Sequence, residues 1–551
     1  MLNILILSSL IVLALLIYHH IIYPVFLSPL SRIPNAHPLA PITPLWCLSI
    51  RYRACENITL YEAHKKLGPV VRIGPNEVSV ACQEGGVKVI YGKGWEKPQW
   101  HEVFMNFGVP NLFSTRWSGP HAIRKRRISN IFSKSYLHAS ADFFVAARTI
   151  LYERYLPLLA GLASRSEPVD IVELNYSSMM DIASAYLLGL PNSSNFLQDV
   201  PTRRRWLSGY RGRIPHFFWL FYLPNFTAWV EKWTGITLVP KFVGEATSYI
   251  EDWCMAMCRK AEAAVGEAKA AGKELKAGDN PVVWRQIRTA WEQERRKEGK
   301  EMTPEMLQQC RLEVASEMLD DLGICPPSYP IDFPFKTNHN IRSPSLTVAA
   351  HETSGITMTY TLWELSRNPD LQNRLHAELQ TLEPSSAFHK ATPSIAPPKT
   401  TDSLPLLDAV LMETLRRHSA LQGPLHRVTP PDATLGPYTG LPANVIVHSN
   451  AYTLHRNPDV FPDPDKWSPE RWFEEDTEAG RKERWFWAFG SGGRMCVGSH
   501  LAILSMKHIL SAIYRNYTTR VVNDEGIEQE DGFIVGPKSG KLILAFEARE
   551  K

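Results

Sequence analysis

A long apolar stretch opens the chain. From Leu2 to Leu27 there is no Lys, Arg, Asp or Glu, and this length suffices for a helix that spans a bilayer. A cleaved signal peptide is the alternative, but it lacks a basic leading segment and a small-residue cleavage site. The pattern therefore predicts a transmembrane anchor over residues 1–27. Positive charges begin only at Arg32, which leaves the rest of the chain in the cytosol by the positive-inside rule.

Hydrophobic periodicity predicts mainly helix in the remainder. Five prolines in residues 28–48 indicate a stiff hinge. Residues 70–80 contain a β-branched run, a Gly-Pro-Asn turn and an alternating segment, which predict a β-hairpin. Helical patterning dominates residues 121–415, and strand-like alternation returns over 437–448 and 532–546. We therefore expect a mainly α fold with a small β region, in one domain from about residue 49 to residue 551.

Composition narrows the class of protein. The chain has 551 residues, and its 60 Lys and Arg nearly balance its 56 Asp and Glu. A nucleic acid is not expected as a partner, because phosphate binding needs a concentrated basic excess. Its eight cysteines include no Cys-x-x-Cys pair, which is typical of a reducing compartment. Cys254 and Cys258 share a helix face, and we expect buried thiols there because no further ligand completes a zinc set.

Residues 489–498 carry the strongest chemical signal, Phe-Gly-Ser-Gly-Gly-Arg-Met-Cys-Val-Gly. A single thiolate, here Cys496, can serve as an axial ligand of haem iron. Gly492 and Gly498 would let the backbone approach a flat macrocycle closely, and Arg494 offers planar donors to a carboxylate. A phosphate loop is excluded because Ser499 stands where its lysine belongs. A structural glycine loop around a buried cysteine is the remaining alternative.

The decapeptide resembles, position for position, the haem-binding signature of the cytochrome P450 superfamily. The other motifs of that family follow in the expected order, so the resemblance covers essentially the whole chain. It implies the cytochrome P450 fold and a haem b cofactor with a cysteine thiolate as axial ligand. It also implies that Cys496 holds the metal and that the cofactor contacts Phe489, Gly492, Arg494 and Gly498.

A Glu-x-x-Arg pair, Glu413 and Arg416, is similar to the motif on the family's K helix. Residues three apart share a helix face, so these two side chains can form an ion pair. In the family, Arg471 of the Pro-Glu-Arg-Trp segment completes a structural triad. Glu-x-x-Arg is common on exposed helices, but its place about 80 residues before the cysteine signature supports the resemblance.

Residues 349–354, Ala-Ala-His-Glu-Thr-Ser, resemble the oxygen-activation motif of the family's I helix. The resemblance implies that Glu352 and Thr353 are catalytic and relay the protons that O–O scission requires. A zinc-protease motif is excluded because residue 355 is Gly where that motif has its second His. Ala350 departs from the family, which usually has Gly at this position, and it adds a methyl group beside the oxygen groove.

Further positions match family contacts to the haem propionates. His121 and Lys125, one helical turn apart, match the family's C helix, and Arg427 matches a third propionate contact. The other cations after His121 indicate either a solvated face or a docking surface for an acidic reductase. Ten aromatic residues and several arginines between residues 203 and 233 match the family's F–G region, and suit either a lipid interface or core packing.

Taken together, these motifs indicate a monooxygenase that activates dioxygen to hydroxylate or otherwise oxidise a small apolar substrate. Electrons are expected from a separate NADPH-cytochrome reductase, because the sequence has no flavin or nicotinamide motif. The chain is most similar to filamentous-fungal members, which suggests a secondary metabolite as substrate. The expected location is the endoplasmic reticulum membrane, crossed once, with the catalytic domain facing the cytosol. A haem-thiolate isomerase or dehydratase and a non-enzymatic haem-binding protein are the alternatives.

Residues 323–347 interrupt the helical pattern. A capped helix start at Thr303-Pro304 leads into a pattern that runs to Asp321 and resumes at Ala349. The family has one continuous I helix here, whereas this segment holds five prolines, each costing about 3 kcal/mol inside a helix. A functional lid is one interpretation. We favour an insertion from an unspliced intron, because excision of residues 323–347 restores the expected spacing.

Overall fold

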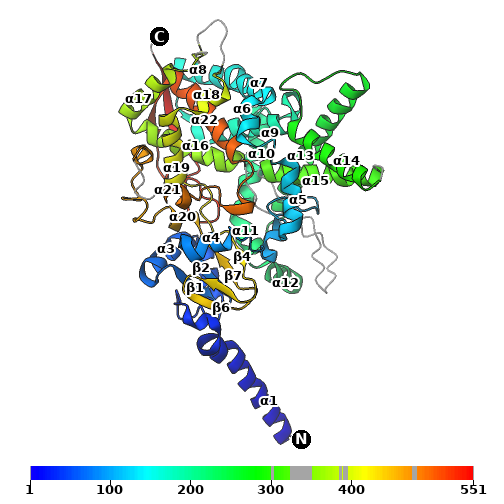
Figure 1. Ribbon diagram of the computed structural model, residues 1–551, viewed down its shortest axis with the longest axis vertical. Coiled ribbons are helices and arrows are strands. Elements are labelled where there is room, and N and C mark those ends of the chain that lie inside the picture. The colour runs from blue at the N-terminus through cyan, green and yellow to red at the C-terminus, as the bar shows by residue number, and fades with distance from the viewer. Residues whose placement is uncertain are drawn as a thin grey trace.

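The computed structural model describes residues 2–299, 303–322, 350–383, 387–388, 395–474 and 481–549. The chain is mainly helical, as predicted, with three small sheets (Figure 1). The anomalous segment 323–347 lies outside the described residues. The helices of the body are α2 (Leu45–Tyr52), α3 (Glu56–Leu67), α4 (Lys88–Ile90), α5 (Ser118–Ile128), α6 (Lys134–Ala139), α7 (Ala141–Thr149), α8 (Leu156–Ser164), α9 (Ile171–Leu188), α10 (Val200–Arg213), α11 (Phe217–Phe221), α12 (Pro224–Thr234), α13 (Lys241–Ala270), α14 (Val282–Lys297), α15 (Pro304–Leu322), α16 (His351–Ser366), α17 (Pro369–Gln380), α18 (Pro398–Asp402), α19 (Pro405–Arg417), α20 (Ala451–Leu454), α21 (Arg481–Trp485) and α22 (Ser499–Asn516).

An apolar helix precedes the body. It runs as α1 (Leu2–Ile17) and continues in wider π-helical turns to Leu27. Residues Ile4–Leu27 are long and apolar enough to cross a membrane, and none of the most apolar window is buried in the protein. In Figure 1 the helix projects from the end of the molecule that carries the strands β1, β2 and β7 and the helix α12.

The proline-rich segment after the anchor is packed onto the body. Leu30 and Ile33 are buried in the same hydrophobic cluster as strands of the first sheet. Buried Arg72 ties the apolar helix to that sheet, because its guanidinium donates to the carbonyl of Pro24 across 2.7 Å and to that of Pro75 across 2.7 Å. The end of the apolar helix is therefore joined to the sheet directly.

The first sheet has four strands in the order β1-β2-β7-β4. The predicted hairpin over residues 70–80 is confirmed as the antiparallel pair β1 (Val70–Gly74) and β2 (Glu77–Val80). Strand β7 (Ile446–His448) lies parallel to β2 and antiparallel to β4 (Arg427–Val428). Segments more than 300 residues apart in the chain thus meet in one sheet.

Two further sheets flank the helical body. One pairs β5 (Ala433–Leu435) with β6 (Tyr438–Leu441); β6 lies within the region predicted as strand, whereas β5 precedes it. The other has the order β3-β9-β8, formed by β3 (Val169–Asp170), β9 (Ile543–Ala548) and β8 (Tyr517–Asn523). The strand-like interpretation of residues 532–546 was correct only at its end, where β9 begins, and it missed β8, which directly follows the helix α22.

Two long helices form the centre of the core. In α9 every residue except Glu173 is buried, and most of α16 is buried as well, as expected for helices without a solvent face. The carboxylate of Asp170 accepts a hydrogen bond from the Val172 backbone N–H and caps the start of α9. The two helices lie close together at Gly355, where any added Cβ would overlap the Tyr176 ring. This contact fixes the position of the first turn of α16, which borders the functional site.

Two compositional interpretations are refined by the structure. Residues 261–301 are rich in Ala, Glu, Lys and Arg, a composition typical of solvated helix and loop, yet α14 within this range buries Trp284, Ile287 and Trp291. Between residues 206 and 233 the aromatic side chains divide into two groups. Those of α10 and α11 lie mainly in the core, whereas α12 exposes Trp229 and Trp233.

Candidate functional site

The loop before α22 places Cys496 at one side of a deep cavity. A short 3-10 helix over Gly492–Arg494 turns the chain, and the Cys496 backbone N–H donates to the carbonyl of Phe489 across 3.0 Å. Cys496 lies three residues before Ser499, the first residue of α22. Amide groups at a helix start stabilise a nearby anion, so this position favours a thiolate.

The two glycines predicted to approach a macrocycle differ in their surroundings. Gly492 has a positive φ of 71°, and an added Cβ would overlap the carbonyl oxygen of Tyr91. The turn and the Tyr91 carbonyl therefore leave no room for a side chain at position 492. Gly492 is not among the residues that line the cavity. Gly498 does line the cavity, and an added Cβ there would meet no atom within 4 Å.

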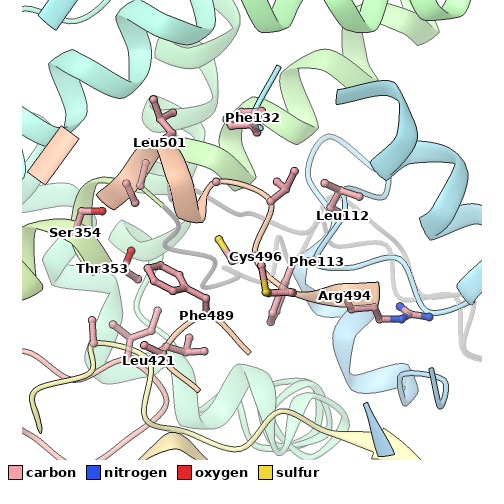
Figure 2. Close-up of a pocket in the computed structure, with 18 of the residues that line it drawn as sticks. Leu112, Phe113, Phe132, Thr353, Ser354, Leu421, Phe489, Arg494, Cys496 and Leu501 are labelled. Atoms are coloured by element: carbon pink, nitrogen blue, oxygen red, sulfur yellow. The ribbon is translucent and has the colours of Figure 1, made fainter. Parts of the chain in front are cut away.

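The cavity itself is mostly apolar, and Figure 2 shows Cys496, Phe489, Leu421, Thr353 and Ser354 arranged around it. Its walls come from α9, α16, the segment before β4, the Cys496 loop and the start of α22. The principal apolar lining residues are Leu112, Phe113, Phe132, Met179, Ala183, Leu187, Ala350, Leu415, Leu421, Phe489, Val497, Leu501, Phe533 and Ile534. An apolar site with a few polar groups is typical of a small-molecule or cofactor pocket.

Positive charges gather at one end of this cavity. Lys97, Lys125, Arg427 and Arg494 all line it together with His121. Burial and the positive charges of Lys97, Arg494, Lys125 and Arg427 lower the pKa of His121 to about 3. Burial also lowers the pKa of Arg427 to about 10. Buried cations are costly without anions, so this end of the cavity fits a group with carboxylates, such as the two propionates of haem.

Each of these four cations also donates hydrogen bonds within the protein, Lys97 to the carbonyls of Leu112 and Phe113 and Arg427 to that of His426. Arg494 donates to the Glu96 carboxylate across 2.7 Å and to the carbonyls of Thr115 and Arg116. Lys125 donates across 2.9 and 3.0 Å to the carbonyls of Gly493 and Met495, and so braces the cysteine loop from α5. Both side chains therefore support the loop and contribute charge to the cavity.

Glu352 and Thr353, predicted to act as an acid–alcohol pair, differ in their relation to the cavity. Thr353 and Ser354 line the cavity, but Glu352 does not. The Glu352 carboxylate instead accepts a hydrogen bond of 2.6 Å from the hydroxyl of Tyr210 on α10. Burial raises the pKa of Glu352 to about 7, although the Tyr210 hydrogen bond opposes this shift. Glu352 can thus exchange a proton near neutral pH behind the wall that Thr353 forms.

The structure brings Glu413, Arg416 and Arg471 together in the core behind the cysteine loop. Arg416 makes a bidentate contact with Glu413, at 2.9 and 2.8 Å, and Arg471 donates to the same carboxylate across 2.9 Å. Both Glu413 and Arg416 are fully buried, and Trp472 and Ser468 supply further hydrogen bonds to Glu413. One carboxylate is thus shared by two guanidiniums, whose other N–H groups donate to backbone carbonyls such as those of His455 and Pro462.

Sequence reasoning missed two contributors. Lys97 is buried and lines the charged end of the cavity, and Tyr210 holds Glu352. Neither residue belongs to a motif. In the sequence, Tyr210 is one of the ten aromatic residues between residues 203 and 233, and nothing distinguishes it from the others. The buried thiols predicted at Cys254 and Cys258 lie in α13.

Comparison with known proteins agrees with this site. The family model described as Cytochrome P450 matches residues 336–544. The cytochrome P450 monooxygenase avaI of Aspergillus versicolor is 26% identical over 80% of this chain and 93% of its own length. The cytochrome P450 monooxygenase macH of Penicillium terrestre is 25% identical over 97% of this chain and 96% of its own length. Pisatin demethylase of Fusarium vanettenii is 23% identical over 91% and 87%.

A mainly helical body with a cysteine loop beside an apolar, cation-edged cavity is the architecture of a haem-thiolate enzyme. The chain is similar to cytochrome P450 monooxygenases over most of its length, and its residues 336–544 match the model of that family. Its cofactor is haem, held through a cysteine thiolate. When bound, the haem supplies dioxygen chemistry, because the thiolate donates electron density that favours O–O cleavage.

Proposed function

We propose that this protein hydroxylates or otherwise oxidises a small apolar organic molecule, a fungal secondary metabolite, with Cys496 as the axial ligand of its haem. One observation carries the proposal: a single apolar cavity is bordered by Cys496, by the hydroxyl-bearing residues Thr353 and Ser354, and by a cluster of cations. The names of the relatives give the reaction class. The apolar lining supports an apolar substrate.

We propose roles for the residues at the cavity and behind its wall. His121, Lys125, Arg427 and Arg494 hold the propionate end of the haem, and Phe489, Gly492 and Gly498 shape the loop beside it. Thr353 delivers a proton from the cavity wall, and Glu352 supplies that proton from behind the wall. Glu413, Arg416 and Arg471 keep the cysteine loop in place.

We propose three regions for the chain: the anchor 1–27, the hinge 28–48 and the catalytic domain 49–551. The apolar helix anchors the protein in the endoplasmic reticulum membrane, with the domain in the cytosol. The exposed side chains of α12 support this placement, because Trp229 and Trp233 are 55% and 70% exposed, and amphipathic aromatic residues suit a lipid interface. Figure 1 shows α12 near the same end of the molecule as the anchor.

A separate NADPH-cytochrome reductase is the proposed electron donor. The basic helix α5 offers less charge for docking than its sequence suggests, since Arg124 and Arg127 form ion pairs with Glu313, at 3.2 and 3.0 Å. Exposed Arg126 remains on the surface of α5. We propose that the reductase contacts the side of the molecule where α5 and the cysteine loop meet.

The test is expression of the full chain in a fungal host that lacks competing oxidases, with metabolite profiling and in vitro turnover of the compounds that change. Product should form only with NADPH, reductase and dioxygen together, and should gain mass by oxygen from isotopically labelled dioxygen. The Cys496→Ala variant is the matched control and should form none. Product that forms without NADPH and dioxygen would instead identify a haem-thiolate isomerase or dehydratase.

A further inference from the structure

A second cluster of ligand-type side chains lies outside the cavity, on the four-stranded sheet. Glu77 begins β2, His448 ends β7, and His426 immediately precedes β4. In the antiparallel pair of β4 and β7, Arg427 pairs with Val447, so His426 lies across from His448. In the parallel pair of β2 and β7, Glu77 pairs with Ile446. Since His448 is two residues after Ile446, Glu77 and His448 lie on the same face of the sheet. The register of the sheet thus brings one carboxylate and two imidazoles to one face.

The distances in this cluster are too long for hydrogen bonds. The Glu77 Oε1 atom lies 3.6 Å from His426 Nε2 and 3.5 Å from His448 Nε2. One ligand atom from each of the three residues falls within 4.8 Å of the others. Ligands about 2.1 Å from a tetrahedral metal ion stand about 3.4 Å apart along each edge. The distances from Glu77 Oε1 to the two imidazole nitrogens therefore match the spacing between two ligand atoms of one metal ion better than they match a hydrogen bond.

The two imidazoles lack the partners that a purely structural histidine has. His448 is fully buried, and neither of its ring nitrogens has a hydrogen-bond partner among the described residues; the same holds for Nδ1 of His426. Neighbouring His64 shows the contrast, because its two nitrogens contact the Gly68 carbonyl and the Ser79 hydroxyl at 2.9 and 2.8 Å. A ring nitrogen of His426 or His448 that has no such partner can bind a metal ion through its lone pair.

The surrounding charges also suit a cation. Arg51 contacts both Glu56, at 2.9 Å, and Glu77, at 2.5 Å. Two carboxylates thus face one guanidinium, which leaves a net negative charge beside the two imidazoles. A carboxylate that ligates a metal commonly accepts a hydrogen bond from a second group, and Arg51 fills that position for Glu77. Four lone-pair sites on the carboxylate allow both contacts.

We propose that Glu77, His426 and His448 bind a divalent transition metal ion, zinc being the ion whose tetrahedral geometry the distances match, with a water molecule as the fourth ligand. The ion joins β2, β7 and the segment that enters β4. Since His426 is followed directly by Arg427 of the cavity, the ion also fixes one edge of the cofactor site. Its role is structural, and it is independent of the oxidation chemistry.

The experiment measures zinc and iron together in the tag-free, haem-loaded full chain, after incubation with low-micromolar zinc sulfate and exhaustive dialysis. The proposal expects one retained zinc ion per chain and a melting temperature that zinc raises. X-ray absorption at the zinc edge should show two imidazole nitrogens and oxygen ligands at about 2.0–2.1 Å. Haem content and the carbon monoxide spectrum, measured on the same sample, report separately on the oxidase.

Variants identify the ligands. His448→Gln should lose the retained zinc and the stabilisation by zinc, whereas His64→Gln, which changes a buried histidine on an adjacent element, should keep both. Wild-type protein that retains no zinc would overturn the proposal. So would retention that His448→Gln leaves unchanged, since that shows binding elsewhere on the surface. A His448→Gln variant that fails to fold leaves the wild-type stoichiometry and absorption spectrum to decide.

Discussion

The Tyr210 hydroxyl donates a hydrogen bond of 2.6 Å to the Glu352 carboxylate and so links α10 to the first turn of α16. Both side chains are buried. This contact joins Glu352, the residue proposed to supply protons, to a helix outside the cavity lining. A movement of α10 would therefore change the protonation of Glu352, because the hydrogen bond favours the ionised form.

The first prediction concerns pH. Burial raises the pKa of Glu352 to about 7, so a proton that Glu352 supplies becomes scarce as the pH rises through 7. The coupling of NADPH consumption to product should fall across that range. Tyr210→Phe removes a hydrogen bond that lowers this pKa, so the fall should move to higher pH. Coupling measured from pH 6 to 9 tests both statements, and an unshifted midpoint in Tyr210→Phe would refute the role of Tyr210.

The second prediction concerns the alcohol at the cavity wall. Thr353→Ala should uncouple the enzyme: NADPH consumption continues, but hydrogen peroxide rises at the expense of product. A loss of general acid catalysis typically costs about 100-fold to 10,000-fold in the assisted step. Ser354→Ala is the matched control, because Ser354 also lines the cavity. If Ser354→Ala uncouples the enzyme and Thr353→Ala does not, the proton passes through the neighbouring hydroxyl.

The third prediction concerns the metal ligand. The reduced carbon monoxide complex of the wild type should absorb at the position diagnostic of thiolate ligation. Cys496→Ala should lose this band, while Cys254→Ala and Cys258→Ala keep it, since those residues lie in α13 and do not line the cavity. A wild-type spectrum from Cys496→Ala would mean that another residue holds the iron.

The fourth prediction concerns stability. Glu413→Ala leaves the buried guanidiniums of Arg416 and Arg471 without their shared carboxylate, which should lower the free energy of unfolding by about 3–5 kcal/mol. The exposed pair Arg374–Glu470, 2.8 Å apart, is the control. Arg374→Ala should cost about 1 kcal/mol or less. Urea unfolding followed by circular dichroism measures the free energy of unfolding of both variants. Equal losses of unfolding free energy in Glu413→Ala and Arg374→Ala would show that burial does not determine how much an ion pair contributes.

The fifth prediction concerns residues 323–347, which lie outside the described residues. The helices on either side, α15 and α16, both pack against α9, in keeping with two halves of one helix. We propose that the segment derives from an unspliced intron. Sequencing of mature transcripts from producing cells should show those codons removed. Spliced message that retains them would establish the insertion as part of the protein.

The fold class was predictable from sequence, and the cysteine loop was recognisable, because both depend on local patterns. The ion pair between Glu413 and Arg416 was also predictable, because three-residue spacing places the two side chains on one helix face. The missed features depend on distant contacts. Tyr210 meets Glu352 142 residues away in the chain, and Arg494 donates to a carbonyl 379 residues away. Strand β8 escaped prediction because its Tyr-Thr-Thr-Arg-Val-Val-Asn sequence follows a helix without a turn signal.

The hydrogen bond from Arg72 to the Pro24 carbonyl has a consequence for motion. Since the end of the apolar helix is fastened to a buried residue of the sheet, the body cannot swivel freely about its stalk. If the stalk lies in a bilayer as proposed, this link holds the body at one tilt and one height above the lipid surface. A search for the proposed reductase in the same membrane would then be lateral diffusion in two dimensions, with one face of the body always presented.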